Sequence, residues 1–116
     1  MRRLLATALL VAAGGDAAAQ PAIPTDTGNS AHDALARYSP RERNQALDRV
    51  LHSVDHGACD VVATRFIEYH KGIAAIWMAT CQDGQRYVMK LIDREDGAMA
   101  VFHCDETPEI RAYCDK

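Results

Sequence analysis

Hydrophobic positions recur with a helical period after residue 40. Leu47, Val50, Leu51 and Val54 fall at i, i+3, i+4 and i+7, which places one apolar stripe along a helix of about four turns. The segment Ser39-Pro40-Arg41-Glu42 precedes the stripe and has a capping serine, a proline at the first helical position and a glutamate at the third. The pattern predicts one amphipathic helix that begins near residue 40 and ends before Gly57.

Beyond Cys59 the hydrophobic pattern changes to that of strands. Residues 61–69, 73–82, 85–92 and 99–104 are rich in β-branched, aromatic and large apolar side chains. Glycine-bearing turns separate these segments at Lys71-Gly72, Asp83-Gly84 and Asp96-Gly97. The pattern predicts a three- to four-stranded antiparallel meander with the amphipathic helix packed on it, which is an α+β fold.

The turns also predict which residues pair. If Asp83-Gly84 and Asp96-Gly97 are two-residue loops, Met78 faces Met89, and Met89 in turn faces Cys104. The face expected under the helix then carries eight residues: Ile76, Met78, Tyr87, Met89, Leu91, Ala100, Phe102 and Cys104. The opposite face, which is expected to meet water, carries Trp77, Arg86, Lys90 and His103 among others.

The four cysteines predict a disulfide-stapled domain. Cys81 and Cys104 point to opposite faces in this register, so a bond between them is disfavoured. We favour Cys59–Cys81 and Cys104–Cys114, because Cys59 starts the first strand beside the end of the second and the tail after Cys104 can fold back. The pairing Cys59–Cys104 with Cys81–Cys114 remains the alternative.

Residues 1–19 have the pattern of a secretory signal peptide. Arg2 and Arg3 precede an apolar run from Leu4 to Ala13, and Ala17-Ala18-Ala19 offers a cleavage site. The run of about ten residues is half of a membrane span, so we expect cleavage near Ala19 and no membrane anchor. With an even cysteine count this predicts an exported protein, periplasmic or secreted, in an oxidising compartment.

The rest of the chain is predicted to form one small domain. Residues 20–29 contain two prolines and a glycine and are expected to be a disordered leader, followed by a single domain over 30–116. Ser30 is expected to cap a short helical turn at the start of that domain. The full sequence has 13 basic and 16 acidic residues, and cleavage removes Arg2, Arg3 and Asp16. The mature chain is therefore expected to have 11 basic and 15 acidic residues and a net charge of −4. A nucleic-acid partner is therefore not expected.

The sequence has one weak candidate for metal binding. His52 and His56 are four residues apart on the predicted helix, with Asp48 nearby, so the two imidazoles share a face and could chelate a divalent ion. Histidines that merely border the apolar stripe are the alternative interpretation. No nucleophile–base pair or phosphate loop is recognisable, so we predict neither enzymatic activity nor a cofactor.

Trp77 is the strongest candidate for a partner-binding residue. It is the only tryptophan, and the predicted register turns it to the open face beside Arg86, Lys90 and His103. This favours an exported, non-enzymatic domain that binds a protein or envelope partner as an inhibitor or accessory factor. The alternatives are that Trp77 packs against Phe66 or is covered by residues 30–38, and that the protein binds a metal or small ligand through the two histidines.

The frame of turns and strands resembles a known family. The segments Ile76-Trp77-Met78-Ala79, Asp83-Gly84-Gln85-Arg86-Tyr87-Val88-Met89 and 93–99 are similar to the strand-turn-strand frame of the small PepSY-type domains of exported bacterial proteins. The resemblance covers roughly residues 40–104. It implies an inhibitory or regulatory periplasmic module that binds another protein and has no catalytic residue.

Overall fold

The structure is a computed structural model that describes residues 22–54, 59–94 and 96–116. Its strands form one antiparallel sheet in the order β2-β3-β4-β5. The elements are α2 (Ser30–Arg37), α3 (Pro40–Ser53), β2 (Val61–His70), β3 (Ala74–Cys81), β4 (Arg86–Ile92), β5 (Met99–His103) and α4 (Pro108–Cys114). The predicted α+β fold, a helix packed on a disulfide-stapled antiparallel sheet, is confirmed.

Local capping signals explain where the helices begin. At the start of α3 the Ser39 side chain accepts a hydrogen bond from the Glu42 amide, and the Glu42 carboxylate accepts one from the Ser39 amide, as the sequence predicts. The N-cap of α2 is Asn29, one residue before the expected Ser30. Helix α4 was not predicted, although Thr107 before a proline is a typical helix start.

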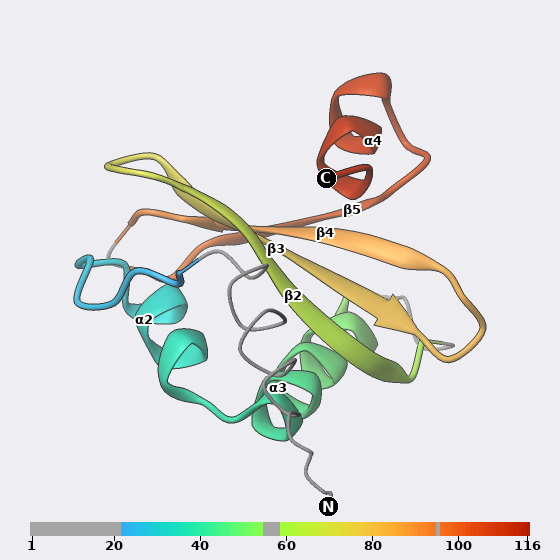
Figure 1. The fold of residues 1–116 in the computed structure, drawn as a ribbon, viewed down its shortest axis with the longest axis horizontal. Helices are drawn as coiled ribbons and strands as arrows, with labels where there is room; N and C mark the ends of the chain where they lie inside the picture. Colours follow the sequence, from blue (N-terminus) through green and yellow to red (C-terminus); the bar gives the residue numbers. More distant parts are fainter. Residues whose placement is uncertain (1–21, 55–58, 95) are drawn as a thin grey trace, which may run out of the picture.

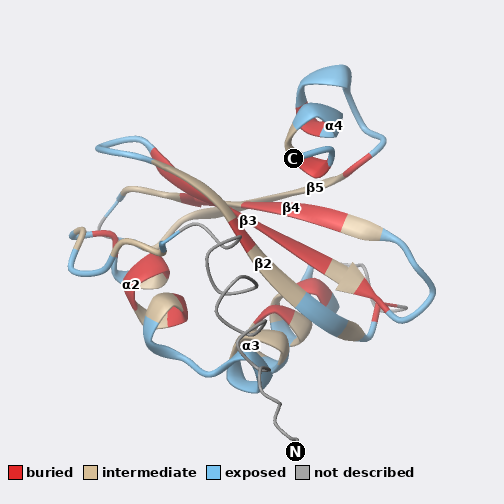
Figure 2. Cartoon of the chain, in the orientation of Figure 1, coloured by how far each residue is buried: buried red, intermediate tan, exposed pale blue. Residues whose placement is uncertain are grey.

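The helices cover both faces of the sheet. Helices α2 and α3 lie on one face and α4 lies on the other (Figure 1). Burial is concentrated in the central strands β3 and β4 (Figure 2). The core beneath α2 and α3 includes Leu35, Leu47, Leu51, Phe66, Trp77, Met89 and Leu91. The core beneath α4 includes Ile76, Met78, Val88, Cys104 and Ile110.

The observed register of β3 and β4 differs from the predicted one by one residue. Met89 pairs with Trp77 and not with Met78. The hairpin loop has three residues, because the Cys81 amide donates to the Gln85 carbonyl at 2.8 Å and leaves residues 82–84 to make the turn. Only Gly84 adopts a positive φ, 92°, whereas a two-residue loop of the expected type needs it at Asp83 as well.

The second predicted hairpin register is also wrong. Met89 pairs with Val101, so its expected partner Cys104 lies three residues away, and Leu91 pairs with Met99. The Ile92 amide donates to the Ala98 carbonyl, so the connection is longer than a two-residue loop at residues 96–97. Ile76, Met78, Phe102 and Cys104, expected under the helix at residue 40, therefore belong to the core beneath α4.

The favoured disulfide pairing is confirmed. Cys59 is bonded to Cys81, and Cys104 is bonded to Cys114. Cys81 belongs to the core beneath α2 and α3, whereas Cys104 belongs to the core beneath α4, so the two lie on opposite faces as predicted. Disulfides of this kind are typical of proteins in oxidising, exported compartments.

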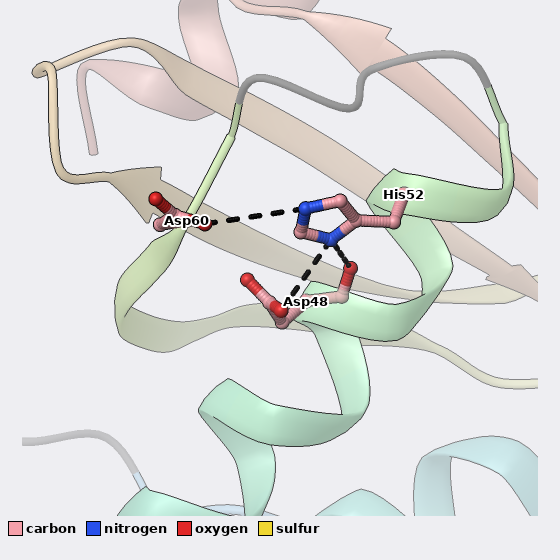
Figure 3. A group of neighbouring side chains, drawn as sticks. All are labelled: Asp48, His52 and Asp60. Atoms are coloured by element: carbon pink, nitrogen blue, oxygen red, sulfur yellow. Dashed lines mark hydrogen bonds and ion pairs between the residues drawn. The ribbon is translucent and has the colours of Figure 1, made fainter.

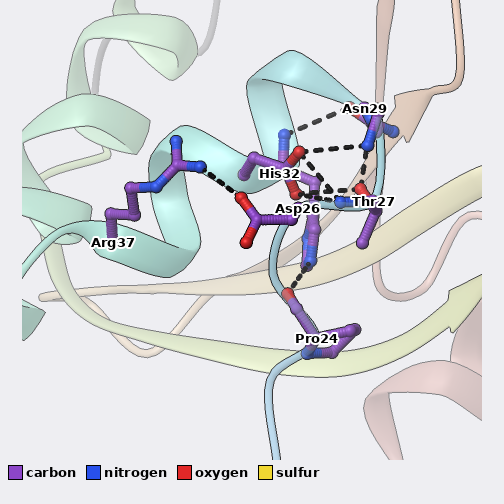
Figure 4. Close-up of polar contacts among 8 residues, drawn as sticks. Pro24, Asp26, Thr27, Asn29, His32 and Arg37 are labelled. Carbon is purple, nitrogen blue, oxygen red and sulfur yellow. Dashed lines mark hydrogen bonds and ion pairs between the residues drawn. The ribbon is translucent and has the colours of Figure 1, made fainter.

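The segment 22–29, expected to be part of a disordered leader, is joined to the domain by hydrogen bonds (Figure 4). The Asp33 carboxylate accepts hydrogen bonds from the amides of Thr27 and Gly28 and from the Thr27 hydroxyl. The Asn29 side chain donates to the Leu91 carbonyl at 2.9 Å. The expectation of disorder is therefore corrected for residues 22–29, because the buried Asp33 carboxylate accepts hydrogen bonds from this segment. Residues 20 and 21 lie outside the described ranges.

The carboxyl group of Asp33 makes the stability of this segment dependent on pH. Burial raises the pKa of Asp33, but the hydrogen bonds from Thr27 and Gly28 outweigh it, so the pKa is lowered from 3.8. Because the folded-state pKa lies below the unfolded one, the stabilisation is present at neutral pH. It is lost as the pH falls through the lowered folded-state value.

We expect Asp33→Asn to lower the free energy of unfolding by about 1–2 kcal/mol at pH 7, because the charge-assisted hydrogen bonds are lost. The difference from the wild type should shrink as the pH falls below 3.8. Urea unfolding at several pH values measures it. Asp26→Asn is the matched control, because Asp26 forms an exposed ion pair with Arg37 in the same segment. An effect of Asp33→Asn that does not change with pH would contradict the prediction.

Candidate functional site

Trp77 does not lie on an open face. Its side chain is 0% exposed and packs against the rings of Phe66 and His32 and under the Arg43 guanidinium. The Phe66 ring centroid lies 5.4 Å from that of Trp77. The expected role of Trp77 as a partner-contacting residue is therefore corrected, because the one-residue shift in register turns it towards the helices. The alternative interpretation, packing against Phe66 and cover by residues 30–38, is confirmed.

His32 connects this core to the segment before α2 (Figure 4). The Trp77 indole N–H donates to His32 Nδ1 at 3.1 Å, and His32 Nε2 lies 2.8 Å from the Pro24 carbonyl oxygen. An indole N–H can only donate and a carbonyl can only accept, so the neutral His32 carries its proton on Nε2. Both ring nitrogens are thereby used inside the fold, and His32 is a structural residue.

Two other predicted partner-binding residues meet at one end of the sheet. Arg86 and His103 line a cavity of about 430 Å³, together with Arg111 from α4. The Arg86 guanidinium donates to the Cys114 carbonyl, and Arg111 pairs with Asp105. His103 Nδ1 accepts from the Asp105 amide at 3.1 Å, so its proton in the neutral form is on Nε2.

Lys90 lies apart from this cavity. Its ammonium group is 5.4 Å from the ring centroid of Phe102 and 5.8 Å from that of Tyr113, on the face covered by α4. These contacts are cation–π interactions within the fold. The four predicted partner-binding residues thus separate into a buried Trp77, a Lys90 engaged with α4, and the pair Arg86 and His103 at the cavity.

The metal-binding candidate is partly retained (Figure 3). His52 lies on α3 close to Asp48 and Asp60, and one possible ligand atom of each residue lies within 4.8 Å of the others. His56, the second predicted ligand, lies outside the described residues. A cavity of about 370 Å³ next to this group is lined by Asp48 and Asp60.

Sequence reasoning missed Arg111 and Asp60. Arg111 lies on α4, and the start signal Thr107-Pro108 together with the Cys104–Cys114 bond would have placed it near the start of β4. Asp60 follows Cys59, and the disulfide to Cys81 holds the start of β2 near α3. Both residues reach their sites through contacts between segments that are far apart in the sequence. Residue spacing along the chain does not indicate such contacts.

No family model, curated protein or solved structure matches this chain. The resemblance to PepSY-type domains therefore stays a prediction. Across the ranges that the structure describes, no helix has the length and apolar character needed to cross a membrane.

Proposed function

We propose that this chain is an exported, non-enzymatic domain that binds a protein partner in the periplasm or outside the cell. The observation that carries the proposal is the convergence of Arg86, His103 and Arg111 on one cavity of about 430 Å³. These side chains come from β4, β5 and α4, so the cavity is formed by the tertiary fold. The signal peptide at residues 1–19 and its cleavage near Ala19 are part of the proposal.

The cavity offers hydrogen-bond donors to an acidic group. Arg111 presents a guanidinium, and the neutral His103 has Nε2–H available to donate. Guanidinium groups bind carboxylates in a fixed planar geometry. We therefore favour an acidic side chain of a partner protein as the group that enters this cavity, with Asp83 and Asp105 at its rim limiting the net positive charge.

The disulfides support a binding role over catalysis. All four cysteines are bonded in pairs, so none offers a thiol nucleophile. The Cys104–Cys114 bond joins the end of β5 to the end of α4 and holds Arg111 against the sheet. A rigid cavity with fixed donors suits recognition, because little side-chain entropy is lost on binding. An inhibitor or accessory factor of the PepSY type fits this arrangement.

We expect Arg111→Ala combined with His103→Ala to weaken partner binding at least tenfold, about 1.4 kcal/mol. The partner is captured from periplasmic extract on the oxidised protein, identified by mass spectrometry, purified and titrated against each variant. Arg94→Ala is the matched control, because Arg94 forms a similar exposed pair with Asp96 away from the cavity. Equal binding by the double variant and the wild type, or no enriched partner, would contradict the proposal.

A further inference from the structure

We propose that Asp48, His52 and Asp60 form a binding site for a divalent transition-metal ion, with zinc as the ion that fits best. Asp48 and His52 lie on α3, one turn apart, and Asp60 lies just before β2. The three side chains point towards one another across the gap between helix and strand (Figure 3). The site is separate from the cavity at Arg86 and does not depend on the proposed protein partner.

The backbone orients the imidazole of His52 for metal binding. His52 Nδ1 lies 2.7 Å from the Asp48 carbonyl oxygen. A carbonyl only accepts, so Nδ1 carries the proton and Nε2 of the neutral ring keeps its lone pair. Nε2 lies 4.0 Å from a carboxylate oxygen of Asp60. Histidines that bind metals commonly donate their second ring N–H to a backbone carbonyl in this way.

The two carboxylates differ in how firmly they are held. Asp48 Oδ1 accepts from the Val61 amide at 2.9 Å, which fixes this carboxylate, and its Oδ2 lies 3.4 Å from His52 Nδ1. The side chain of Asp60 is 71% exposed and has room to rotate. Ligand atoms about 2.1 Å from a tetrahedral zinc lie roughly 3.4 Å apart. The candidate ligand atoms lie within 4.8 Å of one another, so side-chain rotations that shorten these separations by up to about 1.4 Å close the set. The adjoining cavity of about 370 Å³ leaves space for a water ligand.

The donor set selects the class of ion. One imidazole nitrogen with two carboxylates suits zinc and neighbouring transition metals. Calcium takes six to eight oxygen ligands, and a nitrogen donor contributes little to it. Three protein ligands also leave a coordination position open, so we expect weaker binding than at a four-ligand structural zinc site.

The test is a calorimetric titration of zinc chloride into the exported, oxidised protein. We expect one equivalent to bind to the wild type, and His52→Ala and Asp60→Asn each to weaken binding at least tenfold. His70→Ala is the matched control, because His70 is a similarly exposed histidine beside the carboxylate of Glu68 and should leave zinc binding unchanged. Asp48 is not substituted, because it also accepts from the Val61 amide.

Three outcomes of the zinc titrations would overturn the proposal, and a fourth comes from calcium. The first is no zinc binding by the wild type, and the second is wild-type binding by both His52→Ala and Asp60→Asn. The third is binding that is lost only in His56→Ala. Calcium chloride titrated under the same conditions should give no comparable binding, and equal affinity for both ions would overturn the assignment of the site to a transition metal. Tryptophan fluorescence of each variant checks that the Trp77 core is intact.

Discussion

Trp77→Ala is expected to lower the free energy of unfolding by about 3–5 kcal/mol. The side chain is fully buried between β3 and the helices, so its removal leaves a cavity among Phe66, Met89 and Leu47. It also removes the indole N–H that donates to His32 Nδ1, which leaves a buried acceptor without this hydrogen bond. Because small domains are stable by about 5–15 kcal/mol, the loss is a large fraction of the total. Urea unfolding followed by far-ultraviolet circular dichroism measures it.

Trp77→Phe separates the two causes of that loss. Phenylalanine retains an aromatic ring against Phe66 but cannot donate to His32, so we expect an intermediate destabilisation. Val62→Ala is the control, because Val62 is an apolar residue of the same sheet that is 54% exposed. We expect it to change the free energy of unfolding by less than about 0.5 kcal/mol. If Trp77→Ala behaved like Val62→Ala, Trp77 would lie on an open face and the observed register would be contradicted.

The register error shows which part of the sheet the sequence determines. Alternation within each strand was predicted correctly, since Trp77 and Ala79 share a face opposite to Ile76 and Met78. The pairing between strands depends on loop length, and Asp83-Gly84 is compatible with a two- or a three-residue loop. The choice between them is settled by packing, because only the observed register buries Trp77 together with Met89.

The disulfide prediction was correct although both hairpin registers were wrong. The predicted register of the first hairpin is displaced by one residue and that of the second by three. Each odd displacement exchanges the two faces of one strand relative to its neighbour, so the two errors cancel between β3 and β5. Cys81 and Cys104 therefore fall on opposite faces in the predicted and in the observed register. The helix at residue 40 was predictable for a different reason: its capping box and apolar stripe are local in sequence.

The candidate sites were only partly predictable. His52 was identified from its helical position, but its neighbour Asp60 comes from the other side of the connection between α3 and β2. Arg86 and His103 were proposed for the wrong reason, as neighbours of an exposed Trp77. They meet at a cavity because α4 folds over that end of the sheet and brings Arg111 with it.

Removal of the Cys59–Cys81 bond, in Cys59→Ala/Cys81→Ala, is expected to lower the free energy of unfolding by about 3 kcal/mol. The bond closes a loop of sequence separation 22, so its loss increases the entropy of the unfolded chain. Both cysteines lie in the core that contains Trp77, so the transition should appear in tryptophan fluorescence as a shift to lower urea concentration. An unchanged midpoint would contradict a stabilising role for this bond.

Cys104→Ala/Cys114→Ala is the matched comparison. We expect it to destabilise α4 before it affects the rest of the domain. Helix α4 has seven residues, too few to be stable alone, so it depends on Ile110 and the Cys104–Cys114 bond for its position on the sheet. We expect the amides of α4 to exchange hydrogen faster in this variant before the Trp77 core unfolds. The two disulfides belong to the cores on opposite faces of the sheet. Hydrogen exchange should therefore distinguish local unfolding of α4 from unfolding of the core that contains Trp77. Equal acceleration throughout the sheet would show instead that α4 unfolds together with the main core.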